Sequence, residues 1–204
     1  SSLAAIRMGE GKHETAERIL SNCLPLLVIF TAVLMPVCLL FGRELLFFVG
    51  ATENTVEYAL PYFNIYVLGT LPVLVALGLN SFINTQGFAT VSMLTVLIGA
   101  VSNILLDPIL IYVFDMGVHG AAIATVASQT ISAVWVLCFL TGKKTKLHLR
   151  VAYMRPQWSL LGPVIALGLS PFIMNSTESL VGIVINITLT DVSPDAATAD
   201  LYIG

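Results

Sequence analysis

The sequence predicts an all-α polytopic membrane protein, a bundle of helices that cross a lipid bilayer. Of its 204 residues, 57% are hydrophobic and 10% are charged, against about 25% charged residues in an ordinary soluble domain. Several stretches also reach the roughly 20 mostly apolar residues that a helix needs to cross a bilayer. These runs are continuous rather than alternating, which favours helices over strands.

The expected spans follow one another along the chain. Prolines stand inside most of them, and each proline removes a backbone hydrogen bond and can bend its helix. In one span Gly120, Ala124 and Ser128 recur every four residues, a spacing that predicts close contact with a neighbouring helix. The expected spans cover residues 19–42, 56–85, 91–114, 118–141 and 158–188.

Basic residues gather in two connections and predict the orientation of the chain. The segments around 7–18 and 143–155 hold every Lys and Arg except Arg43. Counting crossings places both segments on one face, which the positive-inside rule makes cytoplasmic. Residues 143–157 then form either a cytoplasmic linker between two helical bundles or an ordinary charged loop, and both interpretations stay open.

The composition argues against several classes of function. A net charge of −3 gives no basic surface for nucleic acid. The three cysteines lie within apolar segments, so we expect no structural disulfide. The three histidines scatter over loops on both faces and cannot assemble a metal site within this chain. Because no phosphate-binding loop or catalytic group stands out either, we expect no enzyme activity and no cofactor.

Two carboxylates, Asp107 and Glu178, fall inside expected spans. A charged side chain at the bilayer centre costs about 2.5–3.5 kcal/mol on insertion scales, so such residues usually face a bundle interior or a water-filled cavity. This cost favours a functional role over a purely structural hydrogen bond. Since burial favours the protonated form of a carboxyl group, either residue is a candidate for loading and releasing a proton.

Other polar side chains are expected at a similar membrane depth. A rise of 1.5 Å per residue places Asp107, Tyr62 and Thr125 about 9–10 Å from the outer ends of their spans. The same rise places Glu178 about 15 Å from the outer end of its span. Asn103 lies one turn from Asp107 on the same helical face. These groups, with the carbonyl that the following proline leaves free, predict a site for a proton or a bare Na⁺.

Three stretches carry a family resemblance. They are RMGEGKHETAERIL from Arg7, NILLDPILIYVFDMGVHGAAIATVASQTISAVW from Asn103, and GLSPFIMNSTESLVGIVIN from Gly168. In them the sequence resembles the multidrug and toxic compound extrusion (MATE) transporters, within the subgroup of MepA-like and DinF-like efflux pumps. The middle block is the most specific, because it joins asparagine, aspartate-proline and a glycine-alanine-threonine helix start at fixed spacing.

The resemblance implies twelve helices in two six-helix lobes around a central cleft that opens alternately to either side. On that template residues 1–142 run from the end of helix 2 to helix 6 of the amino-terminal lobe. Residues 143–157 form the cytoplasmic inter-lobe linker, and residues 158–204 hold helix 7 and the start of helix 8. Helix 1 and the remainder of helices 8–12 are then expected outside this chain.

The resemblance also implies roles for particular residues. A cation-coupling site is implied at Asn103 and Asp107 on helix 5. Thr125 on helix 6 and Tyr62 on helix 4 belong to the same implied site. Another branch of the family places a coupling glutamate where Glu178 stands. The stretch before it departs from the family pattern, because a serine stands between Gly-Leu and the proline that commonly follows directly (GLSP). Candidate cleft-lining residues are Asn80, Gln129 and Asn175.

The implied function is export of amphipathic drugs or organic cations by alternating access, coupled to antiport of H⁺ or Na⁺ across the cell (plasma or inner) membrane. The expected partners are a small-molecule substrate and the bilayer, with no nucleic acid and no obligatory protein partner. A flippase for lipid-linked oligosaccharides, from the same superfamily, is the alternative; the absence of Lys and Arg from the spans disfavours it. A channel, which needs charged rings or polar stripes around a pore, and a membrane-embedded enzyme remain less favoured.

Overall fold

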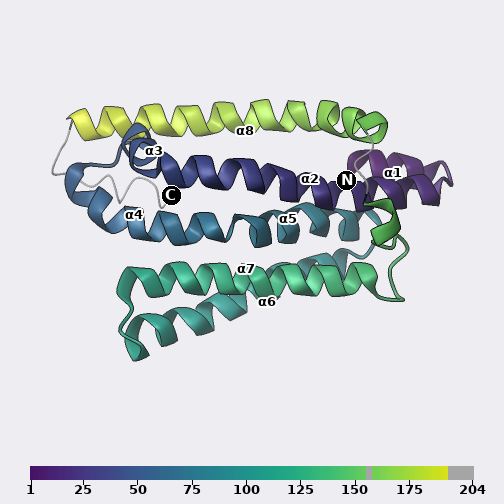
Figure 1. Ribbon diagram of the computed structural model, residues 1–204, viewed down its shortest axis with the longest axis horizontal. Coiled ribbons are helices and arrows are strands. Elements are labelled where there is room, and N and C mark those ends of the chain that lie inside the picture. Colours follow the sequence, from purple (N-terminus) through teal and green to yellow (C-terminus); the bar gives the residue numbers. More distant parts are fainter. Residues whose placement is uncertain (155–157, 193–204) are drawn as a thin grey trace.

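The computed structural model describes residues 1–154 and 158–192, and this part of the chain is helical without any strand (Figure 1). The predicted all-α class is therefore confirmed. The last expected linker residues, 155–157, and the expected start of a further helix after residue 192 lie outside the described residues. The elements are α1 (Ser2–Gly9), α2 (His13–Leu40), α3 (Gly42–Val49), α4 (Glu53–Leu68), α5 (Thr70–Thr85), α6 (Ala89–Pro108), the π-helical turn η1 (Ile109–Val113), α7 (Gly117–Thr141), the 3₁₀ turn η2 (Val151–Tyr153) and α8 (Trp158–Val192).

The predicted membrane spans are confirmed within the described residues. Four helices, α2, α6 with η1, α7 and α8, are long and apolar enough to cross a membrane, and α4 with α5 counts as a fifth when the bent pair is taken as one broken span. Large apolar side chains on these helices also point away from the bundle, and Phe30, Ile104 and Phe172 each expose more than half of their surface. Such an outer surface suits lipid rather than water.

The broken span bends by 54° where α4 ends at Leu68 and α5 begins at Thr70. Pro61 lies within the continuous α4 rather than at the break. Pro72 stands in the first turn of α5, where a missing N–H costs no helical hydrogen bond. The break falls instead at Gly69, where an added Cβ would lie 2.5 Å from Val126 Cγ2 of α7.

Helix α7 is the centre of the bundle and packs against α4, α5 and α6. Its small residues Gly120, Ala124 and Ser128 are all buried, as their spacing predicts. A Cβ on Gly120 would lie 2.9 Å from the backbone C and O of Leu110 in η1. The absence of a side chain there allows α7 to approach the π-helical turn that follows Pro108 closely.

The largest apolar core lies at one end of the bundle. It combines side chains of α1, the start of α2 and the far ends of α5 and α7, and it includes the fully buried Leu147 from the connection after α7. Residues 7–18 and 143–150 meet at this end, which we call the basic end. The two segments predicted to share one face of the membrane thus lie together at one end of the bundle, and α8 returns from this end alongside α2 (Figure 1).

Candidate functional site

A cavity of about 220 Å³ lies between α5, α6 and α7. Its walls mix aliphatic groups with amides and hydroxyls, and no charged residue is among the described residues that line it. Four of the eight residues proposed from the sequence line this cavity, and they come from three different helices. They are Asn80, Asn103, Thr125 and Gln129. The polar lining residues are Asn80, Thr95, Asn103, Thr125, Ser128, Gln129 and Ser132.

The hydroxyl groups on α7 face the cavity because they follow helical spacing. Thr125, Ser128 and Ser132 recur at intervals of three and four residues and lie on one side of the helix. Each donates its proton to a backbone carbonyl: Thr125 to Ala121 at 3.0 Å, Ser128 to Thr125 at 2.8 Å and Ser132 to Thr95 at 3.2 Å. The hydroxyl oxygens therefore keep lone pairs with which they can accept a hydrogen bond or contact a cation.

Asn103 and Asp107 lie one helical turn apart on α6, and both carry a buried polar atom without a partner. Asn103 Nδ2 and Asp107 Oδ1 make no hydrogen bond within the described part of the chain. Asn80 Oδ1 is also buried without a hydrogen-bond partner among the described residues, although Asn80 Nδ2 donates to the carbonyl of Ser92 at 3.2 Å. An unsatisfied buried polar group costs about 1–3 kcal/mol. Asn80 and Asn103 line the cavity, whereas Asp107 is not among its lining residues and lies one turn from Asn103.

The other residues proposed from the sequence lie apart from this cavity. Tyr62 is half-buried on α4 and stacks on Tyr66 with ring centroids 6.1 Å apart. Glu178 is exposed on α8, and Asn175 lines a shallow groove on that helix, beside Phe172.

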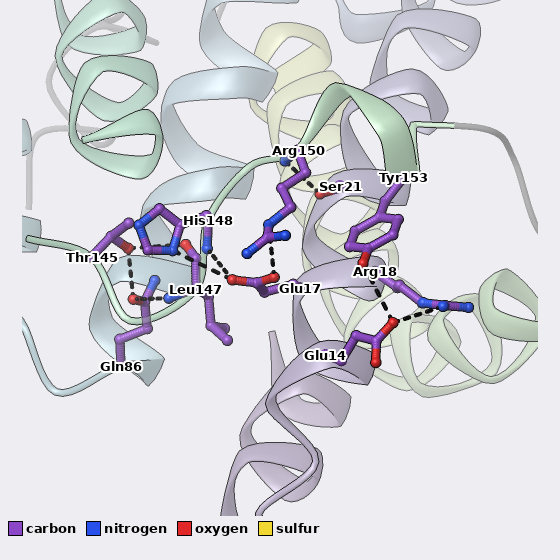
Figure 2. Close-up of polar contacts among 10 residues, drawn as sticks. All are labelled: Glu14, Glu17, Arg18, Ser21, Gln86, Thr145, Leu147, His148, Arg150 and Tyr153. Atoms are coloured by element: carbon purple, nitrogen blue, oxygen red, sulfur yellow. Dashed lines mark hydrogen bonds and ion pairs between the residues drawn. The ribbon is translucent and has the colours of Figure 1, made fainter. Parts of the chain in front are cut away.

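Sequence reasoning missed a second polar cluster at the basic end (Figure 2). Glu17 on α2 is only 8% exposed. Its carboxylate accepts a hydrogen bond from the backbone N–H of His148 at 3.0 Å, lies 3.4 Å from His148 Nδ1, and pairs with Arg150 Nε at 3.1 Å. One turn along α2, the Ser21 hydroxyl accepts the backbone N–H of Arg150 at 3.0 Å.

Gln86, at the end of α5, holds the same connection from its other side (Figure 2). Its Oε1 accepts three hydrogen bonds, from the Thr145 hydroxyl at 2.7 Å and from the backbone N–H groups of Lys146 and Leu147 at 2.8 and 2.9 Å. We call Glu17, Ser21 and Gln86 the connection clamp. The sequence indicated it only through the four-residue spacing of Glu17 and Ser21, which places both on one face of α2. The structure shows that this part of the helix also buries Leu20.

No group of three or more His, Cys, Asp or Glu side chains comes together as a metal-binding cluster among the residues that the structure describes. The site is instead an uncharged polar cavity beside a membrane carboxylate. Apolar spans line this cavity, so the fold and site define a polytopic membrane protein with a polar cavity between its helices.

The comparison with known families is specific. The MatE family profile matches residues 1–109, more than half of the 204 residues, and the chain belongs to the MatE family. The resemblance found in the sequence is therefore confirmed.

Individual relatives agree with this family. The chain is 29% identical over 140 residues to the multidrug export protein MepA of Staphylococcus saprophyticus, an alignment that covers 69% of this chain and 31% of that protein. It therefore spans about a third of the length of this curated relative.

Solved structures place the chain in the same fold. An inward-facing multidrug resistance MATE family transporter of the MOP superfamily is 26% identical with a TM-score of 0.77, covering 91% of this chain and 41% of that one. A MOP superfamily transporter from Pyrococcus furiosus, described as having a binding pocket of reverse polarity that suggests a different function, is 28% identical with a TM-score of 0.75, covering 81% and 37%.

Proposed function

We propose that this chain is part of a cation-coupled antiporter that exports amphipathic drugs or organic cations by alternating access. The observation that carries the proposal is the buried carboxylate oxygen Asp107 Oδ1 on α6, which has no hydrogen-bond partner among the described residues and lies one turn from the cavity-lining Asn103. A carboxylate that must repeatedly take up and release a cation needs free acceptor capacity in an apolar wall, and this arrangement supplies it.

The proposed coupling ion is H⁺ or Na⁺. Asp107 would bind the ion, and the oxygens of Asn103 and Thr125 would contact it from the cavity. Both ions suit oxygen donors, since a carboxyl group carries a proton directly and a bare Na⁺ replaces its water with carboxylate, amide and hydroxyl oxygens. Tyr62 and Glu178 stay in the proposal as further coupling residues, although they lie apart from the cavity.

The proposed substrate class follows from the character of the cavity wall. Aliphatic groups such as Leu77 and Val96 stand beside the amides of Asn80 and Gln129, so the wall offers apolar area with a few hydrogen-bonding groups. This composition suits an amphipathic organic molecule. Asn175, in its separate groove on α8, is proposed to contribute from the opposite side of the cleft.

Alternating access places the described helices in two moving parts. We propose that residues 1–142 belong to an amino-terminal lobe, that 143–157 link the lobes, and that 158–204 begin the second lobe. The basic end would face the cytoplasm of a cell whose plasma or inner membrane holds the protein. A lipid-linked oligosaccharide flippase is less well supported, because its pyrophosphate substrate calls for cations and none lines the described cavity.

The test is ethidium efflux from pump-deficient cells that express the full-length gene. Wild type is compared with Asp107→Asn and with Asp115→Asn at matched membrane expression. Asp115 is the control because it is exposed in the turn after η1, and its φ of 52° is one that asparagine also adopts readily.

We expect efflux from wild type and from Asp115→Asn, and loss of efflux from Asp107→Asn. Equal efflux from all three would remove Asp107 from the mechanism and leave Glu178 as the coupling candidate. In proteoliposomes of the purified protein, imposing a proton gradient and a sodium gradient separately identifies the coupling ion. No efflux from wild type would contradict the proposed substrate class.

A further inference from the structure

The basic side chains at the basic end differ in whether a carboxylate neutralises them. Glu10 is shared by Arg7 at 2.8 Å and Lys12 at 2.9 Å. Hydrogen bonds from Lys12 and then Arg7 lower the pKa of Glu10, so this carboxyl group is ionised at neutral pH and offsets its neighbours. The other neutralised cations are Arg18, paired with Glu14, and Arg150, paired with Glu17.

Three lysines at the same end have no such partner. Lys143, Lys144 and Lys146 form no ion pair with any carboxylate in the described part of the chain. Lys146 Nζ lies 5.6 Å from the centroid of the Phe88 ring. Among the described residues of this end, the three lysines without a carboxylate partner thus lie within four residues of one another, whereas Arg7 and Lys12 share the single negative charge of Glu10.

The connection clamp holds these lysines in a defined arrangement. Thr145 and Leu147 are buried, and both are tied to Gln86 Oε1 by hydrogen bonds. Lys144 and Lys146 alternate with them and are exposed. Two ammonium groups are thus presented on the outer side of a fixed segment, which reduces the conformational entropy that binding an anion would cost.

The lysines also lie where a membrane surface would be. Helix α7, a candidate membrane span, ends at Thr141, and Lys143 follows two residues later. Apolar side chains that face outward, including Val134 and Trp135, lie about two turns before that end. Positive charge therefore follows directly after a span with outward-facing apolar side chains, a combination that a lipid fits better than a soluble anion does.

We propose that Lys143, Lys144 and Lys146 bind the headgroup of an anionic phospholipid, whose acyl chains lie along the outer flank of α7. The phosphate would accept hydrogen bonds from the ammonium groups, and the clamp would keep them in place. Clusters of basic residues beside a membrane span are known to attract anionic lipids. This inference does not depend on the proposed transport function and would stand if that function failed its test.

The experiment is native mass spectrometry of the full-length protein, titrated with phosphatidylglycerol and separately with phosphatidylcholine. Lys144→Gln/Lys146→Gln removes two unpaired charges. Arg7→Gln/Lys12→Gln removes two paired charges from the same end and serves as the matched control. Lys144→Arg/Lys146→Arg keeps the charge, and soluble glycerol phosphate tests whether the headgroup alone is sufficient.

We expect wild type to bind phosphatidylglycerol more tightly than phosphatidylcholine, with a preference that weakens as salt is raised. Lys144→Gln/Lys146→Gln should weaken phosphatidylglycerol binding by about tenfold or more. The control and the arginine variant should each stay within about threefold of wild type.

Three results would overturn the proposal. One is the absence of any preference for phosphatidylglycerol in wild type, a measurement that needs no variant. Another is an equal loss in both glutamine variants, which would mean that only net charge matters. The third is displacement of the lipid by glycerol phosphate at equal concentration, which would indicate a site for a soluble anion.

Discussion

Removal of the Gln86 acceptor is the sharpest test of the connection clamp. Gln86→Leu keeps a similar volume but deletes Oε1, which accepts hydrogen bonds from Thr145, Lys146 and Leu147. The Thr145 hydroxyl keeps its second acceptor, the carbonyl of Leu147 at 2.9 Å. The substitution therefore leaves two backbone N–H groups without a partner.

The expected cost follows from those two groups. Each stranded buried donor costs about 1–3 kcal/mol, and the N–H of Lys146 recovers part of this from water because that residue is exposed. Gln86 Nε2 is itself buried without a partner among the described residues, so its loss offsets about another 1 kcal/mol. We expect the clamped segment to open more easily by about 1–3 kcal/mol.

Hydrogen–deuterium exchange measures this local opening directly. At about 1.4 kcal/mol per tenfold change, amide exchange in a peptide that covers residues 145–149 should accelerate about 5- to 150-fold in Gln86→Leu. The matched control is Asn84→Ala, because Asn84 is exposed on the same turn of α5. If the peptide exchanged at the same rate in both variants, the three hydrogen bonds to Gln86 would not hold the connection.

Two further substitutions test the packing of α7 and the role of Glu17. Gly120→Ala places a Cβ 2.9 Å from backbone atoms of Leu110, so we expect about 1–3 kcal/mol of destabilisation and a lower thermal unfolding midpoint. Gly162→Ala is the control, because its Cβ meets no atom within 4 Å. Equal unfolding midpoints for the two variants would contradict the close approach of α7 to η1. Glu17→Gln keeps an acceptor for the N–H of His148 and loses a pair with Arg150, which is 56% exposed, at a cost of no more than about 1 kcal/mol. Glu17→Leu also strands that N–H, adding about 1–3 kcal/mol, and faster exchange at His148 in the glutamine variant than in the leucine variant would rule this account out.

The membrane spans were predictable because hydropathy is a sum over neighbouring residues. The span expected at 118–141 is α7 (Gly117–Thr141), and the span expected at 91–114 is α6 with η1, ending at Val113. The break at Gly69 was not predictable in this way, since residues on both sides of it are apolar and the close approach of Val126 comes from a helix far along the chain. Prolines allow a bend without fixing its place: Pro61 lies within α4, and Pro108 directly precedes η1.

Part of the candidate site followed from helical spacing, and part did not. Asn103 and Asp107 share a face of α6 because they are four residues apart, so their pairing could be predicted. The buried state of Glu17 could not, because it depends on a backbone segment 131 residues later that folds over α2. Glu178 shows the converse, since an acidic residue within an apolar run is exposed on α8 in the described structure.

The connection clamp also moves the practical boundary of the first helical unit. Hydropathy would end that unit at Thr141, yet Leu147 fills part of the core and residues up to Tyr153 are hydrogen-bonded to α2. A gene split for co-expression of two halves at residue 141 would open a cavity in the first half and leave Gln86 Oε1 without its three donors. A split placed after Tyr153 would keep the described unit intact.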